Sequence, residues 1–467
     1  MGLQELSLYG CQELASLWKN EVRIHHHLPA LRRLVIEGCP KLISLFEVDE
    51  HEEGLQQHEE LPYMMLLEYL EIKNCEKMEK LPRGLHNLRS LQELIIYTCP
   101  CIISFPKTGL PSTLRTLRIE SCDALRSLPE LMMLNSLEKL EVMWCPLLTY
   151  LSSSRTGLPC NLKKMYIEGC AKLESVLVEE GMKMNYTSLE SFEIWCCGSL
   201  KSLPDVTQNN VDGGCLKNLS TLKVLFCENV EYIPKGWFTA TTNLRYMSVD
   251  RRTKLKGLPH HAFNNLTSLQ SLTIGSHDVA AELISSHFTN LTSLSLENVD
   301  MGGNKATSEW GLHRLSSLRQ LTLKGYGWAS FPPVEEEEDG MMWLPPSLIE
   351  LHIWDFPNLG KLSCKEFPSL ERLHIWDCPN LTTITNLGLL PALSELWIQE
   401  CLKLSSFSAE EQGLRQLLPP SLLLLWINGC PLLKERCSKK KKGQYWPLIS
   451  HIPEVKIDYR NVLDPIR

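Results

Sequence analysis

The 467-residue sequence contains no run of about 20 apolar residues, which is the length that a helix needs to cross a bilayer. Its net charge is −8, so it lacks the basic excess typical of nucleic-acid-binding proteins. The segment Met1–Leu6 has neither the basic region nor the apolar stretch of a secretory signal. These absences predict a soluble chain with no membrane span and no nucleic-acid partner.

Motifs that carry catalysis or bind a cofactor are also missing. The segment nearest to a phosphate-binding loop, Gly302–Thr307, has neither the Gly-x-x-x-x-Gly-Lys-Ser/Thr spacing nor a strand before it. No paired Cys-x-x-Cys motif is present, and His25–His27 is interpreted as a surface run between repeats. The basic run Lys439–Lys442 is interpreted as a solvated loop. We therefore expect no enzyme activity, no cofactor and no metal.

What the sequence does have is a repeated phrase, Leu-x-x-Leu-x-Ile-x-x-Cys-x-x-Leu-x-x-Leu-Pro. It occurs in 17 copies, whose mean spacing is about 26 residues, within the 20–29 residues of leucine-rich repeats. The first leucines stand at 3, 31, 67, 91, 114, 137, 162, 189, 219, 244, 269, 291, 318, 348, 370, 393 and 422. The period predicts a stack of similar turns.

The alternating Leu-x-Ile of each copy places two apolar side chains on the same side of a short strand. One copy cannot bury this face alone, whereas stacked copies cover one another. We predict an α/β repeat solenoid, a leucine-rich-repeat horseshoe with a parallel β-sheet on its concave face and irregular or short helical convex segments. The array is expected over residues 1–436, with 244–347 as a candidate irregular junction, and a C-terminal cap and tail over 437–467.

Most of the 18 cysteines share one place in the repeat, the ninth motif position. These are Cys11, Cys39, Cys75, Cys99, Cys122, Cys145, Cys170, Cys197, Cys227, Cys378, Cys401 and Cys430. Cysteine tolerates burial and carries a weak donor, so we predict a ladder of buried structural thiols. Because neighbouring strands would bring these thiols within disulfide range, the ladder favours a reducing compartment, cytoplasmic or nuclear.

Several phrases resemble one protein family. Gly38–Leu42 and Gly429–Leu433 both read Gly-Cys-Pro-x-Leu, and the C-terminal part of the chain contains the segments Cys430–Cys437 and Trp446–Pro453. These phrases resemble the C-terminal leucine-rich-repeat region of plant disease-resistance proteins, which are intracellular receptors with coiled-coil and nucleotide-binding regions.

The resemblance implies a protein-binding region that recognises pathogen effectors or guarded host proteins in the defence response of innate immunity. It also implies that this region regulates the nucleotide-binding domain of the same receptor. ATP or ADP is expected only in that domain, which these 467 residues do not contain, so a partial receptor is expected.

Two other functions remain open at this stage. The substrate-binding repeats of a ubiquitin-ligase adaptor also carry cysteines, but would follow an F-box. A secreted or cell-surface ectodomain would have a signal, capping disulfides and asparagine in place of the cysteine ladder. A phosphate loop upstream of the repeats would favour the receptor, and an F-box would favour the adaptor.

Aromatic residues mark the candidate binding face in the C-terminal half. The strand positions expected to face away from the core are His352, Trp354, His374, Trp376, Trp397 and Trp426, with Trp144 and Trp195 as further examples. Glu350, Arg372 and Glu395 flank the C-terminal group. Adjacent repeats should place His352 beside His374 and Trp354 beside Trp376. Exposed tryptophans are typical of binding hot spots, but such rings can also pave a sheet and cover one another.

Overall fold

The computed structural model describes residues 2–18, 28–46, 64–152, 158–177, 187–206, 216–239, 241–249, 254, 264–275, 288–299, 312–325, 327–332, 344–365, 367–407, 417–438 and 443–462. The runs His25–His27 and Lys439–Lys442 and the segment Gly302–Thr307 lie outside these residues. The described residues form two compact units, residues 1–244 with 252–265, and residues 245–251 with 266–467.

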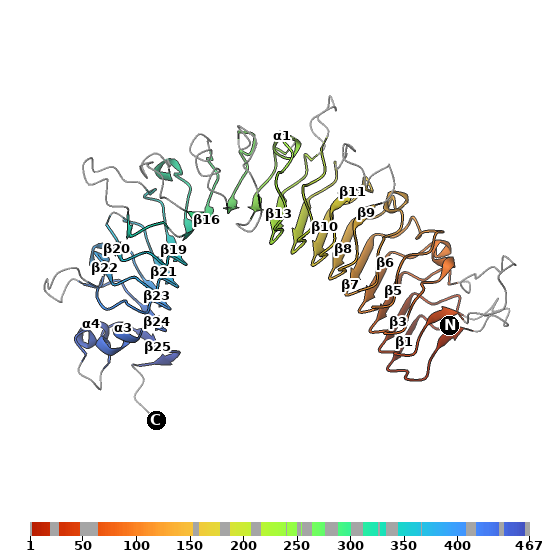
Figure 1. Cartoon of the computed structure of the whole chain (residues 1–467), viewed down its shortest axis with the longest axis horizontal. Coiled ribbons are helices and arrows are strands. Elements are labelled where there is room, and N and C mark those ends of the chain that lie inside the picture. The colour runs from red at the N-terminus through yellow and green to blue at the C-terminus, as the bar shows by residue number, and fades with distance from the viewer. Residues whose placement is uncertain are drawn as a thin grey trace. The chain divides into compact units, whose positions relative to one another are not determined.

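In the first unit, nine parallel strands form one sheet, with one strand for each predicted repeat (Figure 1). They are β1 (Glu5–Tyr9), β3 (Arg33–Glu37), β5 (Tyr69–Lys73), β6 (Glu93–Tyr97), β7 (Thr116–Glu120), β8 (Lys139–Met143), β10 (Lys164–Glu168), β12 (Ser191–Trp195) and β13 (Thr221–Leu225). Each strand begins two residues after the first leucine of its repeat, and neighbouring strands pair in register, as Leu117 does with Leu140.

The second unit continues the same plan with eight repeat strands. They are β14 (Tyr246–Val249), β15 (Ser271–Ile274), β16 (Ser293–Val299), β17 (Gln320–Gly325), β19 (Glu350–Trp354), β21 (Arg372–Trp376), β23 (Glu395–Gln399) and β24 (Leu424–Asn428). Strand β25 (Glu454–Ile457) pairs in parallel with β24, and the antiparallel strand β26 (Arg460–Asn461) follows it. The predicted parallel-sheet solenoid is therefore confirmed.

The remaining elements are short. The strands are β2 (Ser16–Trp18), β4 (Ser44–Phe46), β9 (Tyr150–Ser152), β11 (Ser175–Leu177), β18 (Ser330–Phe331), β20 (Lys361–Ser363) and β22 (Thr383–Thr385). The 3₁₀ turns are η1 (Arg83–Asn87), η2 (Leu131–Met133), η4 (Leu312–Arg314) and η6 (Leu387–Leu389), and the α-helices are α1 (Gly236–Thr239), α3 (Pro431–Arg436) and α4 (Trp446–Ile449). Among the described residues, none of the helices has the length and apolar character to cross a membrane.

Apolar side chains at fixed repeat positions form the core. In one repeat, Leu117 and Ile119 of β7 are fully buried, as are Cys122 and Leu125 of the turn that follows. Each turn covers its neighbours, and a buried leucine or isoleucine contributes about 1.5–3 kcal/mol relative to an exposed one. The strand residues between them stay half-buried on the opposite side, which we call the open face of the sheet.

The ladder cysteines lie inside this core, with one exception. Eleven of the twelve are buried, whereas Cys11 is half-buried because no described turn covers it on its N-terminal side. The thiols donate to backbone carbonyls, as from Cys145 to the oxygen of Met143 at 3.4 Å. Hydrogen bonding of the Cys197 thiol to Cys170 and Cys227, together with burial, raises the pKa of Cys197. In the repeat of β19, the buried ring of Phe356 takes the place of the cysteine and stacks on Trp328 at 5.3 Å.

The C-terminal segment closes the core of the second unit. Helix α3 begins directly after Cys430, and Tyr445, which precedes α4, is buried. The Tyr445 hydroxyl accepts a hydrogen bond from the backbone N–H of Phe407 at 3.3 Å. The segment therefore satisfies a buried backbone donor of the last turns and adds β25 to the sheet.

Candidate protein-binding face

The candidate residues of the C-terminal half all lie on the open face, on adjacent strands β19, β21, β23 and β24. The register produces three rows across these strands. The first holds Glu350, Arg372 and Glu395; the second His352, His374, Trp397 and Trp426; and the third Trp354 and Trp376. The in-register pairing of identical repeat positions is the reason that residues 22 to 29 positions apart in the sequence become neighbours.

The aromatic rings of these rows form one continuous set of contacts. As predicted, His352 lies beside His374 and Trp354 beside Trp376, with ring centroids 4.4 Å and 6.2 Å apart. His374 then contacts Trp397 at 5.5 Å, and Trp397 stacks on Trp426 at 4.4 Å.

Tyr459, between β25 and β26, extends this set by an edge contact with Trp426 at 5.8 Å. We call the seven residues His352, Trp354, His374, Trp376, Trp397, Trp426 and Tyr459 the aromatic patch. The sequence pattern did not identify Tyr459, because it lies in the C-terminal segment outside the repeat phrase.

The rings of the patch differ in exposure, and this separates two roles. Trp354 and Trp376 are 40% and 36% exposed, whereas Trp397 and Trp426 are half-buried against each other. Trp397 and Trp426, the inner pair, cover the sheet and each other. Trp354 and Trp376, the outer pair, present apolar area to solvent, which is the property that a binding anchor requires.

Two lysines contact the ends of the patch. The Lys324 ammonium lies 3.9 Å from the centroid of the Trp354 ring and 3.5 Å from the Asp355 carboxylate. At the other end, the Lys456 ammonium lies 5.3 Å from the centroid of the Trp426 ring. These cation–π contacts were not predicted, because Lys324 and Lys456 come from β17 and β25, whose sequences contain no tryptophan or histidine.

A charged row borders the patch. Arg372 donates to Glu350 at 2.9 Å, and the hydrogen bond raises the pKa of Arg372. The indole N–H of Trp397 donates to Glu395 at 3.2 Å, which fixes the ring. The three predicted flanking residues therefore hold the aromatic rows in place rather than extending freely into solvent.

The open face of the first unit has a different character, because charged side chains dominate it and pair with one another. Its ion pairs are Lys73–Glu37 at 3.4 Å, Arg118–Glu120 at 2.7 Å, Lys139–Glu141 at 2.8 Å and Lys223–Glu193 at 3.2 Å. Such half-exposed pairs contribute little stability, but they make this face polar.

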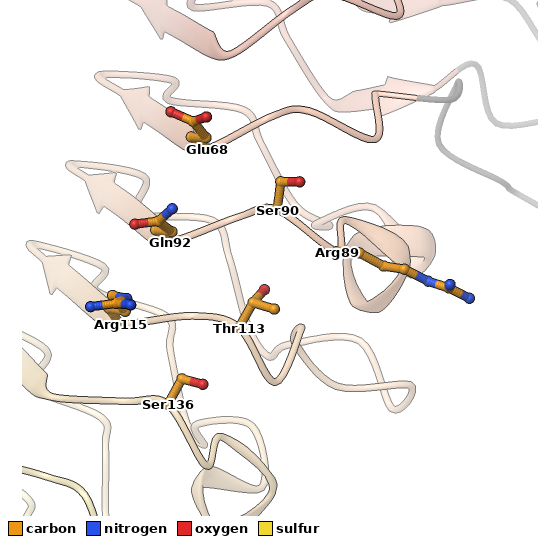
Figure 2. A pocket seen from close by; sticks show the side chains of 7 residues that line it. All are labelled: Glu68, Arg89, Ser90, Gln92, Thr113, Arg115 and Ser136. Atoms are coloured by element: carbon orange, nitrogen blue, oxygen red, sulfur yellow. The ribbon is translucent and has the colours of Figure 1, made fainter.

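A shallow hollow of about 270 Å³ lies along the edge of this unit where the chain enters the strands (Figure 2). Figure 2 shows Glu68, Gln92 and Arg115 in one column, Ser90, Thr113 and Ser136 in a second, and Arg89 pointing away. The hollow is lined by polar side chains from successive turns, without the convergent apolar walls of a small-molecule site.

Two of the aromatic residues predicted for strand positions lie in the first unit. Trp195 is the last residue of β12 and is half-buried on the open face. The prediction for Trp144 is wrong, because β8 ends at Met143 and Trp144 follows it in the left-handed conformation, with φ of 53°. Trp144 stands one position later in its repeat than Trp195 does, directly before the ladder cysteine Cys145, and therefore lies in the turn after the strand.

Comparisons with known proteins agree with the architecture. Residues 104–210 match the family model for leucine-rich repeats of RPS2-like plant disease resistance proteins, and residues 170–323 match a model for BspA-type leucine-rich repeats. The Arabidopsis thaliana protein named "Putative disease resistance protein At3g14460" is 30% identical over 401 residues. That alignment covers 84% of this chain but only 23% of the relative.

Among solved structures, the leucine-rich-repeat protein LIC12759 of Leptospira interrogans has a similar fold. The match has a TM-score of 0.50 at 18% identity and covers 92% of this chain and 90% of that protein. At this identity the likeness concerns the fold alone.

Proposed function

Because the chain carries the leucine-rich repeats of a plant disease-resistance protein, we propose that it is the protein-binding region of an intracellular immune receptor. In this proposal, the chain recognises a pathogen effector or a guarded host protein. It also regulates the nucleotide-binding domain of the same receptor, which is a segment that these residues do not contain. The aromatic patch is its contact surface.

The single observation that carries this proposal is the pair of exposed tryptophans, Trp354 and Trp376, at one end of an ordered set of rings. Trp354 and Trp376 contact each other, Trp376 also stacks on His374, and the Lys324 ammonium lies over the Trp354 ring. A rigid aromatic side chain loses little conformational entropy on binding, so its buried area converts well into affinity.

The repeat architecture supports the same conclusion. One strand per turn gives a broad surface on which neighbouring side chains are fixed by register, and solenoids use such surfaces to bind other proteins. Charged rows beside the patch would select among partners by complementarity, while the tryptophans supply affinity.

The test is association in plant leaf cells with the nucleotide-binding region of a receptor of this family, expressed as a separate chain. The unaltered repeat chain should co-precipitate with that region. In the Trp354→Ala/Trp376→Ala double variant, the association should weaken about thirtyfold, equivalent to about 2 kcal/mol, because the two exposed anchors are removed.

Trp144→Ala is the matched control, since Trp144 is 49% exposed but lies in the first unit. It should bind as the unaltered chain does, and thermal unfolding should show that all variants are folded. Undiminished association of the double variant would exclude the patch as the contact surface, and no association of the unaltered chain would contradict the regulatory part of the proposal.

A further inference from the structure

Three metal-ligating side chains converge on the open face of the second unit, beside the outer tryptophans. Glu350 and His352 stand two residues apart on β19, so they project from the same side, and His374 is the register partner of His352 on β21. One ligand atom from each of the three lies within 4.8 Å of the other two.

The Glu350 carboxylate is held in a fixed position in which it could bind a cation. His352 Nε2 lies 2.6 Å from one oxygen of Glu350, and Arg372 donates to the other oxygen at 2.9 Å. Arg372 therefore orients the carboxylate through one oxygen and leaves the other oxygen to His352.

The environment of His374 is not explained by the hydrogen bond between His352 and Glu350. The Nε2 atom of His374 is buried and has no hydrogen-bond partner in the structure. A buried polar nitrogen without a partner is costly, and a neutral imidazole with a free lone pair is a metal ligand.

We propose that Glu350, His352 and His374 bind one divalent transition-metal ion of the zinc class. Two imidazoles and one carboxylate form the set of three protein ligands that zinc accepts while keeping a fourth position open. Imidazole nitrogen favours zinc, copper, nickel and iron over calcium and magnesium, which prefer oxygen ligands. The open position lies on the same side of the sheet as the aromatic patch.

The distances allow such an ion with small side-chain movements. Tetrahedral coordination with metal–ligand bonds of about 2.1 Å places the ligand atoms about 3.4 Å apart. The His352–Glu350 contact of 2.6 Å has to open to admit the ion, which then replaces the proton shared between them. Arg372 remains hydrogen-bonded to the second carboxylate oxygen, as an outer partner that holds a ligand in place.

The experiment is titration of the full chain with zinc chloride, followed by calorimetry, and then with cobalt chloride, followed by absorption. All proteins carry His25→Gln, His26→Gln and His27→Gln, so that this run of histidines does not contribute. The parent should bind one equivalent of zinc, and zinc should raise its unfolding temperature. Cobalt should give visible ligand-field bands without the near-ultraviolet band of thiolate coordination, since the ladder thiols take no part.

His374→Gln and Glu350→Gln should each weaken zinc binding at least tenfold and abolish the shift in unfolding temperature. His451→Gln, an exposed histidine of the same unit, is the matched control and should bind as the parent does. Circular dichroism of the metal-free variants verifies their fold. Equal zinc affinity in parent and both variants, no binding by the parent, or thiolate bands with cobalt would each overturn the proposal. None of these outcomes depends on whether the aromatic patch binds a protein.

Discussion

At the residue scale, the residue directly before each ladder cysteine has an unusual backbone conformation. There the chain leaves the strand in the left-handed region, with φ of 67° at Gly38, 54° at Asn74 and 66° at Gly169. Glycine and asparagine adopt this conformation readily, whereas other residues do so at a cost. Residues of many types occur at this position along the chain, so the packing of the turns outweighs the local preference.

Gly169 has a second constraint besides its φ angle. A Cβ atom at Gly169 would lie 2.4 Å from the Trp144 ring, whereas at Gly38 the nearest atom would be 3.7 Å away. Gly38→Ala should therefore cost about 1 kcal/mol from backbone strain alone, and Gly169→Ala should cost more. Urea denaturation measures both. In a Trp144→Ala background the excess cost at Gly169 should disappear, and an unchanged excess there would contradict the clash.

At the element scale, each strand divides its side chains between core and open face, and each turn completes the core of its neighbour. The sequence predicts this division because Leu-x-Ile alternation reports directly on burial. It also predicts the rows of the candidate site, such as His352 beside His374, because register follows from the repeat.

The parts of the site that the sequence could not provide are those that depend on exposure and on unlike repeats. The exposed Trp376 ends its strand and the half-buried Trp397 lies in the middle of its own, but both are on the open face, and the alternation alone does not predict how exposed each ring is. Likewise, the contacts of Lys324, Lys456 and Tyr459 with the patch come from elements whose sequences do not match the aromatic repeats. They depend on which strands become neighbours at the ends of the patch.

The C-terminal cap provides a test at this scale. Removing the Tyr445 hydroxyl by Tyr445→Phe leaves the buried N–H of Phe407 without its acceptor, which should reduce the free energy of unfolding by about 1–3 kcal/mol. Tyr232→Phe, at a tyrosine that is 53% exposed, should leave the free energy of unfolding within about 0.5 kcal/mol of that of the parent. Denaturant unfolding followed by fluorescence compares them, and equal stability of the two variants would show that the hydroxyl does not support the last turns.

At the scale of the whole molecule, stacking of similar turns explains why a chain of this length folds without one large globular core. Every turn needs its neighbours, so the unit of stability is the contact between adjacent turns. The same stacking that buries the leucines and thiols on one side of the sheet produces the open face on the other. The proposed binding function and the buried thiol ladder are thus two consequences of one register.

Counting reactive thiols tests this register most directly. Of the 17 cysteines that the structure describes, 13 are buried, and Cys11, Cys101, Cys160 and Cys196 are half-buried or exposed. Burial also raises the pKa of thiols outside the ladder, that of Cys437 to about 12, which suppresses the reactive thiolate.

With an excess of an alkylating reagent on the native reduced chain, mass spectrometry should find rapid labelling at these four cysteines and not at the 13 buried ones; Cys215 lies outside the described residues and is not counted. The 13 buried thiols should be labelled only after denaturation. Rapid labelling of Cys122, Cys145, Cys378 or Cys401 in the native chain would contradict the stacked solenoid and, with it, the binding face that depends on it.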